Sequence, residues 1–142
     1  MGFIDEGKRD GVEVVTGGER LDRPGYFVHP TVLTDVDPAM RLYQQEIFGP
    51  VVAILPFDDD DQVVELANNS EYGLAATAWT KDIARAHGLA KRIQAGTITL
   101  NCQMVFDHSM PFGGQKQSGW GYEWGRDGIE SFMQTKTVYA QL

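Results

Sequence analysis

The most constraining feature of this 142-residue chain is an alternation of β-rich runs with helix-like patterns between residues 51 and 100. Residues 51–57 form a nearly continuous apolar run, which is typical of a strand buried on both faces. Residues 74–79 and 97–100 are two further β-rich runs, and the intervals between the three carry apolar residues at helical spacing. This order predicts an α/β fold with a parallel βαβαβ sheet at its core.

Both predicted helices begin with a capping signal. Four aspartates, residues 58–61, open the first helix, and negative charge stabilises a helix N-terminus by roughly 0.3–1 kcal/mol per group. A calcium loop is disfavoured, because such a loop needs acids that alternate with other residues, then a glycine and a distant glutamate. Thr80 is expected to cap the second helix, which starts at Lys81 and is closed by Gly96.

The flanking regions predict shorter elements. Pro30 interrupts one extended segment, since proline has no N–H to give to a strand ladder. The expected elements are a helix at 3–10 without a capping residue, a strand at 12–15, an irregular extended segment at 27–36, a short helix at 124–133 and a final strand at 136–142.

Composition and charge exclude several classes of protein. Twelve basic and twenty acidic residues give a net charge of −8, which argues against nucleic acid or an anionic membrane as partner. No apolar run approaches the ~20 residues of a membrane helix, and the acidic first ten residues are unlike a signal peptide. The single cysteine, Cys102, rules out an internal disulfide and favours a reducing, cytoplasmic location.

The search for reactive groups leaves two interpretations of Cys102 open. With His108 six residues later and Asp107 beside it, Cys102 is a candidate thiolate nucleophile. The favoured interpretation is a small buried apolar residue, because closeness in sequence is poor evidence for such a pair. His29 and His87 are isolated, so no metal site is expected, and no phosphate-binding glycine motif is present.

Two segments have unusual chemistry. In residues 46–50 (EIFGP), Glu46 and Phe48 precede a Gly-Pro turn. A carboxylate accepts hydrogen bonds from a sugar diol and an aromatic ring packs beside a flat heterocycle, although an exposed turn acid with a core phenylalanine is the simpler reading. In residues 111–119, three glycines follow or flank Phe112, which indicates either a pocket lining or turn chemistry.

These two segments resemble the C-terminal part of the NAD(P)-dependent aldehyde dehydrogenase superfamily, and the resemblance runs from about residue 4 to residue 142. Its order and spacing make chance agreement improbable. The other matching motifs are Gly25-Tyr26-Phe27, Pro30-Thr31-Val32, Ala67-Asn68-Asn69-Ser70, Tyr72-Gly73-Leu74, Ala95-Gly96-Thr97, Asn101 and Lys116 with Ser118-Gly119.

The resemblance implies a reaction and roles for particular residues. In that family a cysteine thiolate attacks an aldehyde, hydride passes to NAD or NADP, and water activated by a glutamate releases the carboxylic acid. Glu46 resembles the acid that holds the nicotinamide-ribose hydroxyls, and Phe48 the aromatic ring beside it. The residues that resemble the substrate pocket are Phe112, which faces the aldehyde, and Met104, Val105 and Phe106 in the tunnel loop.

The resemblance also implies what this chain lacks. Full-length members are several times longer, and their Rossmann domain, general base and catalytic cysteine precede the matching segment. Cys102 matches a different position, and Tyr122 stands where the family usually has arginine. We therefore expect a partial catalytic domain at 1–135, a tail strand at 136–142, no catalytic residue, and no activity of the chain alone.

The tail suggests a partner. Thr137 to Leu142 resembles the strand that pairs with another subunit, so self-association or docking on a full-length dehydrogenase is expected. Two further hypotheses stay open beside the inactive dehydrogenase segment: a non-catalytic interaction module that works through this strand, and an independent enzyme that uses Cys102 with His108.

Overall fold

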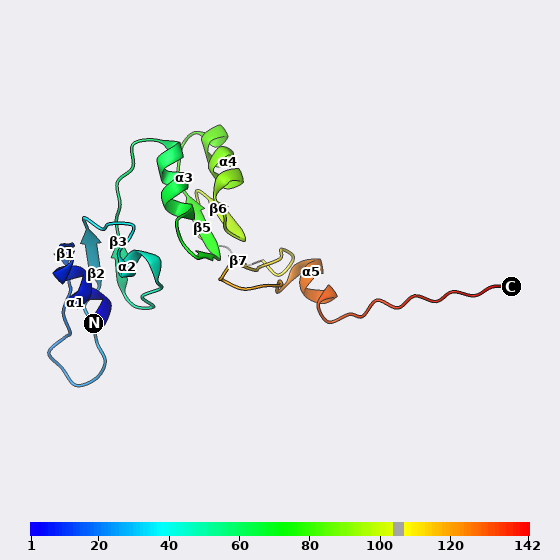
Figure 1. Cartoon of the computed structure of the whole chain (residues 1–142), viewed down its shortest axis with the longest axis horizontal. Helices are drawn as coiled ribbons and strands as arrows, with labels where there is room; N and C mark the ends of the chain where they lie inside the picture. The colour runs from blue at the N-terminus through cyan, green and yellow to red at the C-terminus, as the bar shows by residue number, and fades with distance from the viewer. Residues whose placement is uncertain (104–106) are drawn as a thin grey trace. The chain divides into compact units, whose positions relative to one another are not determined.

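A computed structural model describes residues 1–103 and 107–142 (Figure 1). The chain divides into two compact units, Met1–Ser70 and Glu71–Leu142. The division expected at residue 135 concerns function and stays a prediction. The first unit contains α1 (Gly2–Arg9), β1 (Glu13–Thr16), β2 (Thr31–Thr34), α2 (Arg41–Gln44), β3 (Val51–Ala53) and α3 (Asp60–Asn68). The second contains β4 (Tyr72–Gly73), β5 (Ala75–Ala78), α4 (Ile83–Arg92), β6 (Thr97–Leu100), β7 (Gln115–Lys116) and α5 (Gly125–Glu130).

The first unit is built on a three-stranded mixed sheet in the order β1-β2-β3. β1 pairs antiparallel with β2, with an irregularity between Val14 and Thr16, and β2 pairs parallel with β3. The core of this unit consists of Val12, Leu33, Val36 and Leu42. Thr31 is also buried, and its hydroxyl accepts from the Gly18 N–H at 2.9 Å and donates to the His29 carbonyl at 2.8 Å. The central strand therefore satisfies its buried polar group locally.

The second unit contains a strand–helix–strand (βαβ) element, in which α4 connects the parallel strands β5 and β6. The register pairs Ala75 with Thr97 and Ala78 with Leu100. A separate antiparallel pair, β4 with β7, brings Gly73 beside Gln115, and the Ser118 hydroxyl accepts from the Gly73 N–H at 3.0 Å. Helices alternating with parallel strand pairs confirm the α/β class.

The two central helices test the capping predictions. The acidic start of α3 is confirmed, because the Asp59 carboxylate is the N-cap and accepts from the Gln62 N–H at 2.8 Å. The cap predicted for α4 is wrong. Asp82, not Thr80, caps this helix by accepting from the N–H groups of Ala84 and Arg85. A carboxylate is at least as good an N-cap as a hydroxyl, and α4 consequently begins at Ile83.

The strand expected at 51–57 is shorter and less buried than predicted. β3 covers only Val51–Ala53, and 51% of Val52 is exposed. Ile54 still donates its N–H to the Leu33 carbonyl at 2.9 Å, but Pro56 has no N–H with which to continue the ladder. The expected three-stranded parallel run is therefore replaced by two parallel pairs, β2–β3 and β5–β6.

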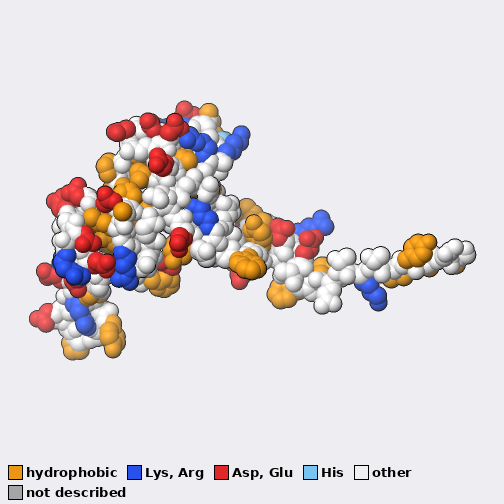
Figure 2. Space-filling model, in the orientation of Figure 1, with side chains coloured by type: hydrophobic (Ala, Val, Ile, Leu, Met, Phe, Trp, Pro, Cys, Tyr) orange, Lys and Arg blue, Asp and Glu red, His pale blue; other side chains and the backbone are white. Residues whose placement is uncertain are grey.

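The C-terminal segment, residues 134–142, has neither helix nor strand hydrogen bonding within this chain. Its side chains are exposed, with Tyr139 at 87%, and Figure 2 shows hydrophobic groups along it. A strand that pairs only with another chain would have no ladder here, so the tail strand stays a prediction. None of the helices among the described residues has the length and apolar character needed to cross a bilayer.

Candidate functional site

The turn formed by residues 45–50 follows α2 directly and leads into β3. Gln45 leaves the helix in an extended conformation while its N–H still donates to the Arg41 carbonyl at 2.9 Å. At the other end, the Pro50 carbonyl accepts from the Thr31 N–H at 2.8 Å, which joins the turn to β2. The turn is therefore fixed at both ends.

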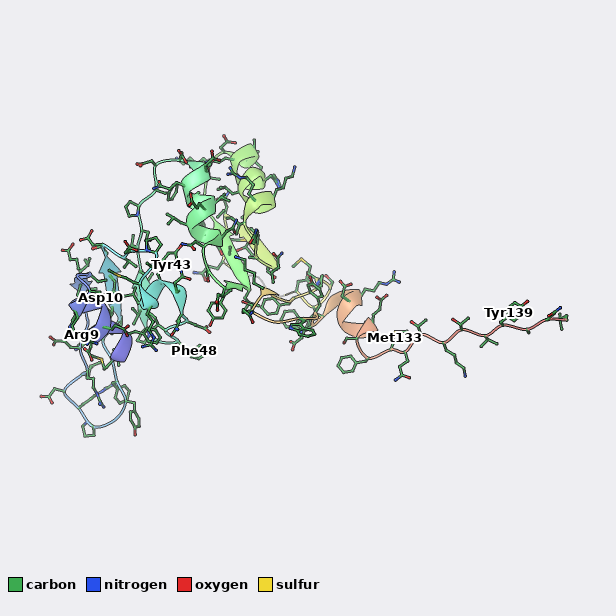
Figure 3. All side chains as sticks on the ribbon, in the orientation of Figure 1. Arg9, Asp10, Tyr43, Phe48, Met133 and Tyr139 are labelled. Atoms are coloured by element: carbon green, nitrogen blue, oxygen red, sulfur yellow. The ribbon has the colours of Figure 1, made fainter. Side chains whose placement is uncertain are left out.

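Phe48 is the most unusual residue of this turn. Its φ of 50° lies in the left-handed region, which costs a residue with a side chain roughly 1–3 kcal/mol. Its ring is 89% exposed, and Figure 3 shows it projecting from the ribbon. Because Phe48 is exposed, burial of its ring within the described residues does not offset the strain of its backbone. The ring points away from the core of the unit. Glu46, two residues earlier, is exposed as well.

The second predicted segment is held by a pair of backbone hydrogen bonds. Phe112 and Glu123 exchange N–H···O bonds of 2.8 Å in both directions. The half-buried Phe112 ring lies 5.7 Å from the Trp124 ring, tilted by 38°. Phe112 lines a pocket of about 280 Å³, whose other side chains include Thr97, Ile98, Met110, Pro111 and Trp124. This pocket is apolar, except for the Asp107 carboxylate and a buried Thr97 hydroxyl without a hydrogen-bond partner.

Trp124 was not among the predicted site residues. It occupies the left-handed region with φ 62°, and its ring contacts both Phe112 and His108, with its centroid 5.0 Å from that of His108. The Gly125 N–H donates to the His108 carbonyl at 3.0 Å, which holds this conformation. No periodicity signals such a contact, because it joins loop residues that are distant in sequence.

The two predicted partners of Cys102, Asp107 and His108, make contacts of their own. The Asp107 carboxylate accepts from the N–H and the hydroxyl of Ser109, at 2.9 and 2.8 Å. These two bonds, helped by the neighbouring His108, lower the pKa of Asp107. The His108 ring packs on Trp124. Cys102 is half-buried, and so less buried than its favoured interpretation expected. Its non-catalytic role stays a prediction.

The predicted site residues therefore fall into three sets. Glu46 and Phe48 lie together on one turn of the first unit, and Phe112 lines a pocket of the second. Met104, Val105 and Phe106 lie outside the described residues, so the tunnel loop stays a prediction.

Comparison with known proteins identifies the family of this fold and site. The profile of the aldehyde dehydrogenase family matches residues 1–138. An aldehyde dehydrogenase of Enchytraeus buchholzi is 48% identical over 98% of the chain, and the mitochondrial aldehyde dehydrogenase of Homo sapiens is 46% identical over all of it. The NAD⁺ complex structure of aldehyde dehydrogenase from Bacillus cereus matches 99% of the chain with a TM-score of 0.95 and 45% identity.

The chain belongs to the aldehyde dehydrogenase family. The resemblance seen in the sequence is therefore confirmed, together with its α/β fold. The chain spans 28% of the length of the two relatives and 29% of the Bacillus cereus protein.

Proposed function

We propose that this chain supplies the nicotinamide-ribose contact and one wall of the aldehyde pocket in an NAD(P)-dependent aldehyde dehydrogenase. The observation that carries the proposal is the strained, exposed Phe48 beside the exposed Glu46 on a turn fixed at both ends. The NAD⁺ complex of the Bacillus cereus relative supports the choice of cofactor. The proposed reaction is oxidation of an aldehyde to a carboxylic acid.

The residues of the turn fit this cofactor chemically. The Glu46 carboxylate has two oxygens, each able to accept a hydroxyl hydrogen bond from a ribose diol. The Phe48 ring offers an apolar face to a flat heterocycle. When bound, the nicotinamide supplies a hydride acceptor. Phe112 would form the wall against which the aldehyde is oriented, with Trp124 behind it.

We propose further that the chain does not oxidise aldehydes by itself. This proposal rests on the family resemblance, which implies that the nucleophilic cysteine, the general base and the dinucleotide-binding domain correspond to none of these 142 residues. We also propose that the protein is cytoplasmic, because its single cysteine is unpaired and disulfides are rare in reducing compartments.

The test is a titration of the chain with NAD⁺, followed by amide NMR. We expect shifts at Glu46 and Phe48 with millimolar affinity, because most of the cofactor contacts are missing. Glu46→Gln should weaken binding about tenfold, since it removes the charge from the accepting oxygens. Glu65→Gln makes the same change at an exposed position on α3 and should leave the affinity unaltered.

Two results would contradict the proposal. Shifts confined to other residues would show that the turn does not contact the cofactor. NAD⁺ or NADP⁺ reduction by the chain with a panel of aldehydes would show that it contains its own nucleophile, and Cys102 would then return as the candidate.

A second proposed function is assembly through residues 137–142, as a pairing strand for another copy or for a full-length dehydrogenase subunit. It is favoured by the exposed apolar side chains of Val138, Tyr139 and Leu142. We expect the chain to be oligomeric at low micromolar concentration, and deletion of residues 137–142 to make it monomeric in sedimentation. Val15→Ala, an exposed change on β1, is the control. A monomeric parent chain would refute this function.

A further inference from the structure

The C-terminal end of α3 accepts hydrogen bonds from residues beyond the helix. The last carbonyls of any α-helix have no intrahelical partner. Here the last turn has no basic residue, and Asn69 (φ −78°, ψ 57°) does not adopt the left-handed cap conformation. The Asn69 N–H donates to the Glu65 and Leu66 carbonyls at 2.9 and 3.2 Å, and the Ser70 N–H donates to the Asn68 carbonyl at 2.9 Å. Any donor from another element adds to these backbone bonds.

α2 supplies donors to this end of α3. The Tyr43 hydroxyl donates to the Leu66 carbonyl in the last turn. The Gln44 amide nitrogen donates to the Asn69 carbonyl at 3.2 Å and to the Pro38 carbonyl at 2.7 Å. Tyr43 is half-buried against the core of the unit, and Figure 3 labels it on α2. Burial raises the pKa of its phenol, so the hydroxyl remains a donor at neutral pH.

These hydrogen bonds are important because α2 is too short to be a stable helix by itself. It has only four residues, and a single helical turn is not stable without tertiary contacts. On another side, Arg41 forms an ion pair with Glu6 at 3.0 Å and lies over the Phe3 ring at 4.2 Å. Leu42 is anchored in the core. The position of α2 therefore depends on side chains that hold it to α1, to the core and to α3.

The turn that carries Glu46 and Phe48 starts where α2 ends. Glu46 follows Gln45, whose N–H makes the last hydrogen bond of α2. We infer that Tyr43 and Gln44 are positioning residues for this turn, which set the place of Glu46 by fastening α2 to the C-terminal end of α3. The relevance of that placement to cofactor binding rests on the proposed function.

The test uses the whole chain with 4-fluorophenylalanine incorporated at position 48 alone, so that the single fluorine resonance reports Phe48 and a phenylalanine introduced elsewhere carries no fluorine. Tyr43→Phe removes only the donating hydroxyl. We expect it to shift the Phe48 fluorine resonance, to accelerate exchange of the Gln45 amide, and to weaken NAD⁺ binding about threefold to tenfold. Gln44→Met, which removes the other donor at similar length, should act in the same direction and serves if Tyr43→Phe does not fold.

Two controls separate positioning from a loss of stability. Thr34→Val removes a hydroxyl bond to Glu13 in the same unit, 3.2 Å long, without touching α2. Tyr26→Phe makes the identical chemical change on a side chain that is 98% exposed. Neither should move the Phe48 resonance or the NAD⁺ affinity, whereas a purely structural role of Tyr43 predicts the same response to Thr34→Val.

The outcomes decide the two proposals independently. An unchanged Phe48 resonance and Gln45 exchange rate in both Tyr43→Phe and Gln44→Met would overturn the positioning role. An absence of NAD⁺ shifts in the parent chain would overturn the proposed function of the turn, while the fluorine and exchange measurements would still decide whether Tyr43 positions it.

Discussion

Leu33→Ala is expected to destabilise the first unit by about 2–5 kcal/mol. Leu33 lies on the central strand of the sheet, is only 1% exposed, and packs with Val12, Val36 and Leu42. Truncation removes its transfer free energy and leaves a cavity that strands on both sides prevent from closing. A unit of this size has little stability to spare, so a large fraction should be unfolded without denaturant.

Urea unfolding followed by NMR signals of the first unit measures this effect. Val52→Ala is the matched control, because Val52 lies on the adjacent strand with half its surface exposed, and should cost less than about 1 kcal/mol. If the two variants lost the same free energy of unfolding, Leu33 would not be part of a buried core on this sheet.

Gly96→Ala is expected to displace the glycine-rich segment that carries Phe112. A Cβ on Gly96 would overlap the Gly113 carbonyl oxygen and crowd Gly114, both of which are backbone atoms. The Gly96 N–H also donates to the Gly73 carbonyl at 3.0 Å, so a shift of Gly96 away from Gly113 would disturb this hydrogen bond. We expect the free energy of unfolding of the second unit to fall by about 3 kcal/mol, with large shifts of the Phe112 and Trp124 ring signals.

Gly88→Ala is the control for this substitution. Gly88 lies within α4, and a Cβ there would meet no atom within 4 Å. The change should stabilise the helix by roughly 0.5–1 kcal/mol, because alanine loses less conformational entropy than glycine. Ring signals that stay in place in Gly96→Ala would show that the close approach of Gly96 to Gly113 does not position Phe112.

Elements with a local pattern could be predicted from the sequence. α3 follows from its aspartate cap and apolar spacing, and α4 from apolar spacing although its predicted cap was wrong. β5 and β6 follow from apolar or β-branched runs that start just after a glycine. β4 and β7 could not be found in this way. They are two residues long, and Tyr72 pairs with Lys116, so the pairing depends on contacts remote in sequence. β3 was predicted too long, at 51–57, because the apolar run was given more weight than Pro56, which cannot donate a hydrogen bond to the strand ladder.

In the candidate site, too, local features could be predicted from the sequence and long-range contacts could not. The Gly-Pro turn beside an acid and an aromatic residue is a local signal that singled out Glu46 and Phe48. Their assignment to the cofactor came from the family resemblance and stays a prediction. The bond from Tyr43 to Leu66 joins residues 23 positions apart, and the contact of Trp124 with His108 joins two irregular loops. The sequence contains no local trace of either, because both depend on how separate elements pack.

The acceptors used by Tyr43 and Gln44 are all main-chain carbonyls, those of Leu66, Asn69 and Pro38. Every residue type offers such an oxygen, so the partners can mutate without loss of the bond as long as the local backbone path is kept. The donors have no such freedom, since few side chains have their length and polarity. Substitutions at the end of α3 should therefore leave the turn of residues 45–50 in place, whereas substitutions of the donors in α2 should not.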